Sequence, residues 1–465
     1  MNTLNDHKTR VEDVQRSVRA CRRSGVLAKI YHGGSNSTRN FSSSGFAYID
    51  ASKLNHIVKI DVDGRYVLAE PNVPFDKLVD ATLRFGLIPP MVPEFPGITV
   101  GGAVQGGSGE SSSFKHGTFH DTCMEYEFVL GDGSTIATSP KLHPDLFWGT
   151  SCTFGSLGVM TLLKIKLVPA KSYVHLRYYR TNSHAEAVQR IQEEVRNDPD
   201  FVDGIIFSPQ HGVVMTGDYA DTAELHRERF SRFYDEWFSV HAEKVSRAHE
   251  FYEETIPIRD YLFRYDRGGF WVAKLGFTRI PFNRLTRVSL SGLYKTRTLY
   301  KLLHGSGYSY VCMTQDICLP ENQTLPFLDY IDSALAIYPL WLCPLRPARR
   351  DIFSCTALNT DLVINVGVRG LAKPSAASFI DRNRALEKEI IRRGGRKVLY
   401  AHAHYTEKEF WSLYDIDSYR RLRDTYHADA IFADLYQKIH TLPSMSRPSR
   451  LRGLRALIIS PYKRT

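Results

Sequence analysis

The stretch Phe95-Pro-Gly-Ile-Thr-Val-Gly-Gly-Ala-Val-Gln-Gly-Gly-Ser-Gly-Glu-Ser-Ser-Ser-Phe-Lys-His-Gly117 decides how this chain folds. It gathers seven glycines between two runs that are typical of β-strands. Glycine lets backbone N–H groups approach a ligand closely, and consecutive N–H groups form a concavity that attracts anions such as a pyrophosphate. A flexible Gly/Ser linker is the alternative. The apolar anchors Ile98, Val100, Val104 and Phe114 favour an ordered phosphate-binding loop, because a linker does not need them.

Two further glycine turns support this interpretation. His32-Gly-Gly-Ser-Asn-Ser-Thr-Arg39 follows an expected strand at residues 26–31, and Arg39 would neutralise a phosphate oxygen. Cys152-Thr-Phe-Gly-Ser-Leu-Gly-Val159 follows Asp145-Leu-Phe-Trp148. Alone, each is also consistent with an ordinary tight turn, but the three in this order indicate a dinucleotide site. No Gly-x-Gly-x-x-Gly motif lies between a strand and a helix, so the dinucleotide is not held in the doubly wound manner.

The composition is that of a globular protein with more than one domain. The chain has 465 residues, 43% of them hydrophobic, which is enough for two or three domains with a sizeable core. The seven cysteines form no Cys-x-x-Cys pair, so we expect free thiols in a reducing compartment and no metal site. No segment is typical of a signal peptide or is apolar for long enough to cross a bilayer, which predicts an intracellular protein without a transmembrane segment.

The net charge of +10 is concentrated near the end of the chain, where residues 447–464 carry six basic and no acidic side chains. With its leucines and isoleucines, this tail would suit peripheral contact with an anionic membrane surface. A frayed, solvated end is the alternative, and we favour it. Nucleic-acid binding would need a basic face with aromatic or helix-turn-helix context, which the sequence lacks.

The main stretch resembles known flavoproteins. Pro96-Gly-x-Thr-Val-Gly-Gly102 and the motif that ends at Gly117 resemble the second phosphate loop of the vanillyl-alcohol-oxidase type of FAD-binding domain. Glu110-Ser-Ser-Ser-x-Lys-His-Gly117 is similar still more closely to the Δ24-sterol reductase family, as is Tyr338-Pro-Leu-Trp-Leu-Cys-Pro344. Residues 25–440 resemble this family in the order of their motifs. The likeness is to a short, fungal-type form without the N-terminal membrane span of some members.

The resemblance implies an α+β protein with the two-subdomain FAD-binding fold of the vanillyl-alcohol-oxidase (PCMH) type and an α+β cap. It implies an FAD-binding domain at 1–170, a substrate cap at 171–395, a return to the FAD domain at 396–440 and a basic tail at 441–465. Within the cap we expect a charged helix over 222–234. We interpret Gln315-Asp316 as a solvated strand face in preference to polar lining of a pocket.

The cofactor that the resemblance implies is FAD, with NADPH as its reductant. Some relatives link the flavin covalently to a histidine after the first paired glycines, but Ser35 and Asn36 occupy that place here, so we expect non-covalent FAD. The residues implied to bind it are His32, Gly33, Gly34, Ser35, Asn36, Ser37, Thr38, Arg39, Pro96, Gly97, Thr99, Val100, Gly101, Gly102, Gly106, Gly107, Ser108, Gly109, Ser112, Lys115, His116, Gly117, Gly155, Gly158 and Val159.

The implied substrate pocket contains Arg264, Trp271, Tyr338 and Trp341, although core packing is an equal alternative for the three aromatic residues. Arg369 stands where relatives often have an aromatic residue. The substrate class that the resemblance implies is a sterol. Arg369 and the missing membrane span leave another isoprenoid or natural product as the alternative.

The family reduces an isolated side-chain double bond of a sterol. Such an alkene accepts hydride poorly, so a protein acid would protonate it before hydride arrives. We favour Tyr405 and His404 as proton donors, because residues 396–405 are expected to return beside the flavin. His402, Glu409 and Asp266 are further candidates.

Two other classes of function stay open. An FAD-dependent oxidase or dehydrogenase on the same fold would pass electrons from a hydroxylated substrate to oxygen. An inactive flavoprotein would act as an interaction protein. For the reductase we expect a location in the cytoplasm or on the surface of the endoplasmic reticulum membrane.

Overall fold

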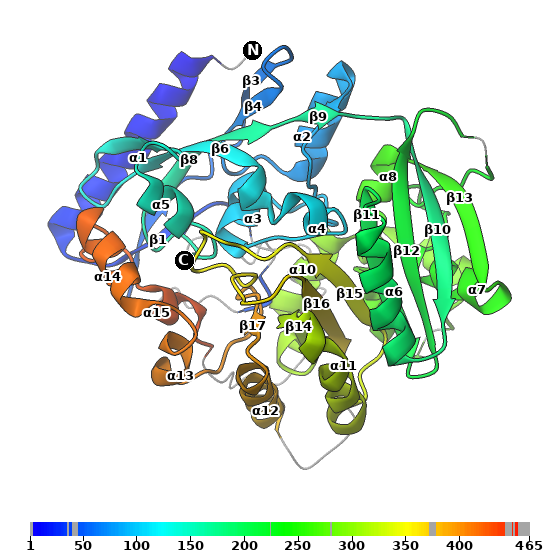
Figure 1. The fold of residues 1–465 in the computed structure, drawn as a ribbon. Helices are drawn as coiled ribbons and strands as arrows, with labels where there is room; N and C mark the ends of the chain where they lie inside the picture. Colours follow the sequence, from blue (N-terminus) through cyan, green and yellow to red (C-terminus); the bar gives the residue numbers. More distant parts are fainter. Residues whose placement is uncertain are drawn as a thin grey trace.

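Two antiparallel sheets organise the chain into two parts, which we call the cofactor part and the cap after the expected domains (Figure 1). The computed structural model describes residues 3–34, 37–39, 45–223, 225–279, 281–371, 378–441, 449 and 452–453. Residues 35–36 of the first glycine turn and nearly all of the basic tail lie outside the described residues, so the predicted membrane contact of the tail stays a prediction.

The cofactor part is built on a five-stranded sheet in the order β3-β4-β8-β6-β7, with a parallel pair β1-β2 and an antiparallel pair β5-β9 beside it. Its elements are α1 (Leu4–Ser24), β1 (Ala28–Tyr31), β2 (Ala47–Asp50), β3 (Ile57–Asp61), β4 (Tyr66–Ala69), α2 (Phe75–Thr82), η1 (Leu83–Phe85), β5 (Leu87–Ile88), α3 (Val100–Gly106), α4 (Ser113–His116), η2 (Phe119–Thr122), β6 (Cys123–Val129), β7 (Thr135–Thr138), α5 (Pro144–Gly149), β8 (Val159–Lys166) and β9 (Val168–Pro169). The main glycine stretch thus forms two short helices, α3 and α4, between β5 and β6.

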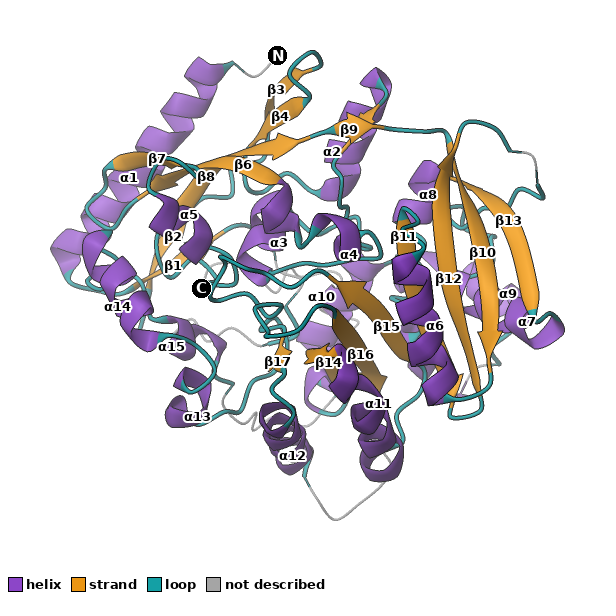
Figure 2. Ribbon diagram, in the orientation of Figure 1, coloured by secondary structure: helices purple, strands orange, loops and turns teal. Residues whose placement is uncertain are grey.

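The cap is built on an eight-stranded antiparallel sheet in the order β13-β10-β12-β11-β15-β16-β14-β17 (Figure 2). Its elements are β10 (Tyr173–Thr181), α6 (His184–Arg196), β11 (Phe201–Ser208), β12 (His211–Ala220), α7 (Phe238–Ala248), β13 (Phe251–Pro257), α8 (Ile258–Leu262), η3 (Val272–Arg279), α9 (Arg284–Ser289), η4 (Ser291–Tyr294), α10 (Thr296–Ser306), η5 (Tyr308–Tyr310), β14 (Met313–Pro320), α11 (Glu321–Tyr330), η6 (Ile331–Leu335), β15 (Leu340–Leu345), β16 (Val363–Gly370), α12 (Phe379–Arg392) and β17 (Arg396–Lys397).

Alternation along the cap strands divides the sheet into two faces. Helices α6, α11 and α12 cover one face, where Leu342 and Val366 join their apolar side chains in a separate core. The neighbouring residues Trp341, Cys343 and Asn365 point to the opposite face, toward the cofactor part. Alternate residues of the cap strands therefore face the space between the two parts.

After β17 the chain returns to the cofactor part through α13 (Glu407–Trp411), α14 (Ile416–Thr425) and α15 (Leu435–Ile439). The Ala28 N–H donates to the Ile431 carbonyl at 2.7 Å, which joins this segment to β1. Ala428, Ile431 and Phe432 share a core with the buried side of α1.

Two expectations about the cap are wrong. The described residues of 222–234 form no helix, because Arg227 bridges to Thr255 on β13 and the Phe230 N–H donates to Asp260 Oδ2 at 3.1 Å. These contacts draw the segment along the sheet edge. Gln315 and Asp316 are buried and not solvated, since α12 covers the first and the cofactor part faces the second.

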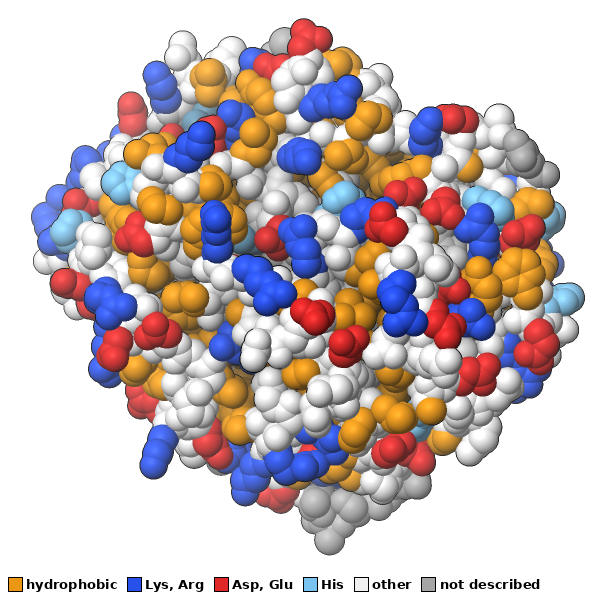
Figure 3. Space-filling view, in the orientation of Figure 1, with side chains coloured by type: hydrophobic (Ala, Val, Ile, Leu, Met, Phe, Trp, Pro, Cys, Tyr) orange, Lys and Arg blue, Asp and Glu red, His pale blue; other side chains and the backbone are white. Residues whose placement is uncertain are grey.

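The family resemblance predicts the fold class correctly, since helices and sheets combine in an α+β arrangement. All seven cysteines are buried free thiols, as expected. Among the described residues, no helix has both the length and the apolar character that crossing a bilayer requires. On the face in Figure 3, basic and acidic side chains are interspersed.

A buried charge cluster fixes α1 to the five-stranded sheet. His7 Nδ1 lies 2.8 Å from Glu70 Oε1, and His7 Nε2 lies 3.1 Å from Glu127 Oε1. Arg10 Nε donates to the same Glu70 oxygen at 2.8 Å. Burial would lower the pKa of His7, but the two carboxylates outweigh it and raise the pKa to about 9. The charged imidazole thus holds the first helix in place.

The His7 cluster predicts a loss of stability at alkaline pH. The pKa of His7 is higher in the folded state than the ordinary value, so its contribution is complete below about pH 6.5 and is lost as pH rises through 9, by up to about 3 kcal/mol. Urea unfolding of wild type and His7→Ala at pH 6.5 and 9.5 measures this. The variant should lose most of the wild-type difference, while the exposed-site control His226→Ala keeps it. Equal pH dependence in wild type and His7→Ala would contradict the assignment.

Candidate functional site

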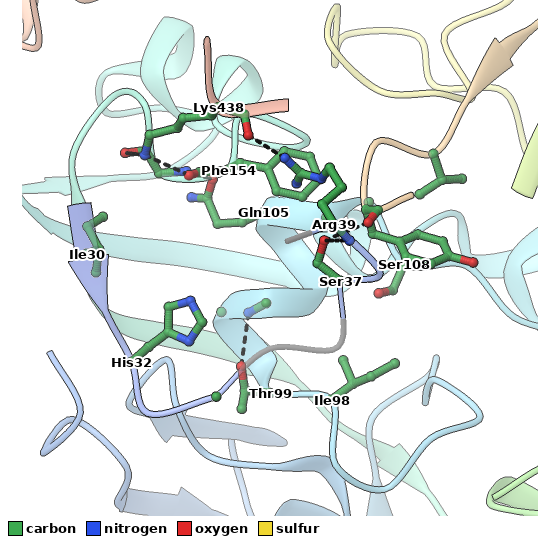
Figure 4. A pocket seen from close by; sticks show the side chains of 18 of the residues that line it. Ile30, His32, Ser37, Arg39, Ile98, Thr99, Gln105, Ser108, Phe154 and Lys438 are labelled. Atoms are coloured by element: carbon green, nitrogen blue, oxygen red, sulfur yellow. Dashed lines mark hydrogen bonds between the residues drawn. The ribbon is translucent and has the colours of Figure 1, made fainter. Parts of the chain in front are cut away.

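A cavity of about 1210 Å³ lies between the two parts (Figure 4). All three glycine turns meet on its wall, although they come from residues 32–39, 97–109 and 154–159. The predicted residues that line it are His32, Gly33, Gly34, Ser37, Arg39, Gly97, Thr99, Gly101, Gly102, Gly106, Gly107, Ser108, Gly109, Gly155, Gly158 and Val159. Strands β14, β15 and β16, helix α10 and residues 433–441 supply much of the rest of the wall.

Other predicted cofactor residues lie off this wall. Val100 packs in the core, and the backbone N–H of buried Thr38 donates to the Tyr400 carbonyl. Ser112 donates to the Pro90 carbonyl, and the Pro96 carbonyl accepts from the Asp76 N–H. Ser35 and Asn36 lie outside the described residues.

The motif Glu110–Gly117 joins the cofactor part to the cap. Lys115 forms an ion pair with Asp198 at 3.2 Å, and Arg346 donates to the carbonyls of Lys115 and His116. A Cβ on Gly117 would lie 2.3 Å from Asp121, so only glycine fits beside it. Lys115, His116 and Gly117 are therefore absent from the cavity wall.

Arg264 completes this junction from inside. Its Nη2 lies 3.0 Å from Glu110 Oε1 and 3.0 Å from Asp203 Oδ2, with both carboxylates buried. Tyr265 and Trp341 donate to the same Asp203 oxygen at 2.7 and 3.1 Å. Arg264 thus acts beneath the cavity wall, whereas Trp341 also lines it.

Glycine is required in α3 and directly after it, at Gly107, for different reasons. A Cβ on Gly101 would lie 2.5 Å from the Pro71 side chain, so glycine permits the helix to pack there. Gly107 has φ +70° and would place a Cβ 2.4 Å from Cys152 Sγ. A Cβ on Gly106 would meet nothing within 4 Å, so this glycine keeps space open on the cavity side.

One end of the cavity is positively charged. The Arg39 guanidinium donates to the Lys438 carbonyl and stacks 4.9 Å from the Phe154 ring, and its Nε has no partner among the described residues. Lys438 Nζ donates to the carbonyls of Phe154 and Gly155 at 3.0 and 2.9 Å. Within the described chain, neither cation pairs with a carboxylate. Figure 4 shows both side chains above α3.

Burial makes the charged forms of these side chains less stable. Burial lowers the pKa of Arg39 to about 10. Burial, with the positive charges of Arg423, Lys29 and Arg39, lowers the pKa of Lys438 to about 7. Burial also lowers the pKa of His32, so its imidazole is neutral. An anionic ligand would relieve the repulsion between the cations.

The cap closes the opposite end with a polar cluster. Arg369 Nη2 donates to Asp316 Oδ1 and Oδ2 at 3.0 and 2.8 Å, and Tyr400 donates to Oδ2 at 2.7 Å. Asn365 donates to Oδ1 at 3.3 Å. Burial would lower the pKa of Arg369, but Asp316 raises it above its ordinary value. Arg369 is thus a fixed cation on the wall.

Two predicted substrate residues lie behind this wall. Trp271 Nε1 donates to the Arg369 carbonyl at 3.0 Å, so Trp271 supports β16. Tyr338 donates to Asp332 at 3.0 Å and contacts His184, away from the cavity.

The favoured proton donors also lie off the wall. His404 Nδ1 lies 3.1 Å from the Thr441 carbonyl, and burial lowers its pKa to about 4. Burial, with Glu387 nearby, raises the pKa of Tyr405 well above its ordinary value. The wall residues of this stretch are Val398 and Tyr400 instead. The other candidates are also engaged elsewhere: His402 is buried beside Tyr310, Glu409 pairs with Arg384, and Asp266 accepts from Thr296.

Sequence reasoning missed several residues of the wall, namely Glu94, Tyr300, Tyr310, Cys343, Asn365, Tyr400 and Lys438. Alternation offers one signal, because β16 reads apolar at 364, 366 and 368 and polar at Asn365 and Arg369. Lys438 and Tyr300 carry no local pattern that marks them.

Comparison with known proteins first defines the class. A model of the FAD binding domain matches residues 8–139, which contain two of the three glycine turns. The chain is similar to the Delta(24)-sterol reductase of Homo sapiens, with 30% identity over 400 residues, or 83% of this chain and 76% of that protein. The protein of that name from rat (Rattus norvegicus) is 29% identical over 452 residues, which is 93% of this chain and 86% of the rat protein. The one from Arabidopsis thaliana is 26% identical over 429 residues, which is 84% of this chain and 76% of that protein. The chain belongs to the Δ24-sterol reductase family, as its motifs predict.

The described wall fits FAD. The pyrophosphate of FAD carries negative charge, and the uncompensated cations Arg39 and Lys438 suit it. The open space beside Gly106 leaves room for the cofactor against the backbone. Pockets that bind drug-sized ligands measure about 300–1,000 Å³, so a cavity of about 1210 Å³ has room for a dinucleotide and part of a second molecule.

The space beside Gly106 can be tested with a branched side chain. Gly106→Val should fold, because nothing lies within 4 Å of the added Cβ, but its side chain should lower FAD affinity at least about tenfold. Gly292, also with open space but outside the cavity wall, gives the matched control Gly292→Val. Flavin fluorescence quenching measures both. Normal FAD affinity in Gly106→Val would show that the cofactor lies elsewhere.

Lys438 predicts a pH dependence of FAD affinity. With a pKa of about 7 in the free protein, Lys438 is charged below pH 7, and above it FAD binding must take up a proton. Wild-type affinity should therefore fall by up to about tenfold per pH unit above 7. Lys438→Met should bind more weakly at pH 6.5 and lose this slope, whereas the exposed-site control Lys408→Met keeps it. A slope unchanged in Lys438→Met would refute the role.

Proposed function

We propose that this protein is an NADPH-dependent FAD enzyme that reduces an isolated C=C bond in the side chain of a sterol or a related isoprenoid. The observation that carries the proposal is the continuity of one cavity, which runs from the cations Arg39 and Lys438 to the aromatic and polar floor of the cap. Membership of the Δ24-sterol reductase family supports the substrate class.

The three glycine turns would hold FAD by their backbone amides, without a covalent bond. Arg39 and Lys438 would bind its pyrophosphate. Bound FAD, once reduced, supplies hydride. The residues of this chain must then position the alkene, exclude water and provide a proton.

The cap end of the cavity suits an apolar substrate. Trp341, Leu345, Val398 and Tyr300 contribute apolar or aromatic surface to its wall. Aromatic faces also stabilise positive charge that develops on a protonated alkene. The Asp316–Arg369 ion pair lies beside this surface and holds two opposite charges together.

NADPH is proposed as the reductant. Helix α10 brings Arg297 and Lys301 to the same cavity, and Arg297 is held by Asp76 at 2.7 Å. Basic side chains at this position suit a phosphorylated nucleotide that enters before the substrate. NADPH and the sterol would then use the cavity in turn.

The proposal is tested by the visible spectrum of the purified protein without oxygen. NADPH should bleach the yellow flavin in the absence of sterol, and a Δ24-sterol such as desmosterol should restore the colour while its saturated product appears. A sterol that already has a saturated side chain serves as the control. A flavin that ignores NADPH, but is bleached by an alcohol and restored by air, would replace the proposal with an oxidase.

A further inference from the structure

Glu94 lies on the cavity wall immediately before the main glycine stretch. It is 8% exposed, in a segment whose position is fixed on both sides. The Ser112 hydroxyl donates to the Pro90 carbonyl at 3.1 Å, and the Phe95 ring packs edge-on against Phe270 and Tyr300 at centroid distances of 5.6 and 6.4 Å. The carboxyl is therefore held by its backbone, in a water-poor part of the cavity.

The groups around Glu94 come from five segments. Arg369 on β16, Asp316 on β14, Tyr300 on α10, Cys343 on β15 and Glu110 before α4 all interact with it electrostatically. Among the described residues, no side chain hydrogen-bonds to its carboxyl.

The cation that interacts with Glu94, Arg369, is shared with a second carboxylate. Arg369 Nη2 is engaged with both oxygens of Asp316. Burial raises the pKa of Glu94 to about 8, and the charges of Glu110 and Asp316 add to this against the opposing effect of Arg369. Near neutral pH, Glu94 is therefore a carboxylic acid that carries a proton into the cavity.

Its neighbours on the wall suit this role less well. Burial raises the pKa of Tyr300 and Tyr400, which makes both weaker acids. Asp316 accepts hydrogen bonds from Arg369, Tyr400 and Asn365, so it serves as an acceptor.

We propose that Glu94 is the catalytic proton donor of the reduction; this inference rests on the proposed function. The O–H bond of Glu94 breaks, and the π electrons of the alkene form a C–H bond at its less substituted carbon. The tertiary cation that remains accepts hydride from the reduced flavin cofactor, which gives the saturated product. The Glu94 carboxylate then regains a proton from solvent, and Arg369 stabilises it in the meantime.

Glu94→Gln keeps the shape of the side chain but removes its acidic proton. The variant therefore separates the reduction of the flavin by NADPH from the reoxidation of the flavin by the alkene. Bleaching by NADPH should stay within about twofold of wild type, because it needs no proton from Glu94. Recolouring by desmosterol should slow by about 10²–10⁴-fold, the usual contribution of a general acid. Glu254→Gln, a buried glutamate of the cap that contacts Tyr178 and His241, is the matched control and should recolour normally.

A second readout does not depend on turnover. Infrared spectra of the FAD-loaded protein should contain a protonated carboxyl band that disappears above pH 8 and is absent from Glu94→Gln. If Glu94→Gln fails to fold, Glu94→Asp serves instead. Its band should titrate at a different pH, and its recolouring rate should fall with pH at that same value.

The outcomes distinguish the two proposals. Wild-type protein that bleaches with NADPH but is never recoloured by a Δ24-sterol refutes the proposed function. Wild-type protein that recolours, with Glu94→Gln recolouring equally fast, refutes the role of Glu94 alone. Persistence in Glu94→Gln of the carboxyl band that titrates near pH 8 also refutes it, whereas bands from the buried Asp351 and Glu110, whose pKa values burial also raises, do not bear on the test.

Discussion

The buried contact of Arg264 with Glu110 and Asp203 is the interaction on which the rest of the structure depends. It joins the end of the main glycine stretch to the cap sheet, with distances of 3.0 Å to both carboxylates. Removing one partner of a buried ion pair typically costs about 3–5 kcal/mol, because the remaining charge is left without compensation. Trp341 donates to Asp203, so the same contact also places an aromatic side chain on the cavity wall. Arg264, Glu110 and Asp203 do not line the cavity, but their contact holds the glycine stretch and the cap sheet on its two sides together.

The fold follows from the sequence where local patterns are strong. Glycine turns mark three segments that need unusual backbone or close approach, and all three meet on one wall. Strand alternation explains which side of the cap sheet faces them. The expected helix over 222–234 does not form. Its charged residues favour a helix when the segment is considered alone, but in the folded chain Arg227 pairs with Thr255 on β13, and this long-range contact overrides the local preference.

The site is less accessible to sequence reasoning, because it is assembled from distant segments. The motif Glu110–Gly117 is the most specific family signature, yet it lies mainly at the junction with the cap. The sequence does not indicate which residues of the C-terminal return reach the cavity: Tyr400 lines the wall, and Tyr405, five residues later, is buried behind it. Glu94 has no pattern of its own, and only the surrounding burial and charges give it chemical character.

The contact between Arg39 and the Lys438 carbonyl spans almost the whole chain. During synthesis the first two glycine turns emerge from the ribosome several hundred residues before Lys438 does. A half-made chain therefore has the first two glycine turns but lacks the part of the cavity wall that Lys438 supplies. With Arg39 and Lys438 in the role proposed above, cofactor capture would follow the folding of the C-terminal return, and a bound flavin would report that translation has passed this segment.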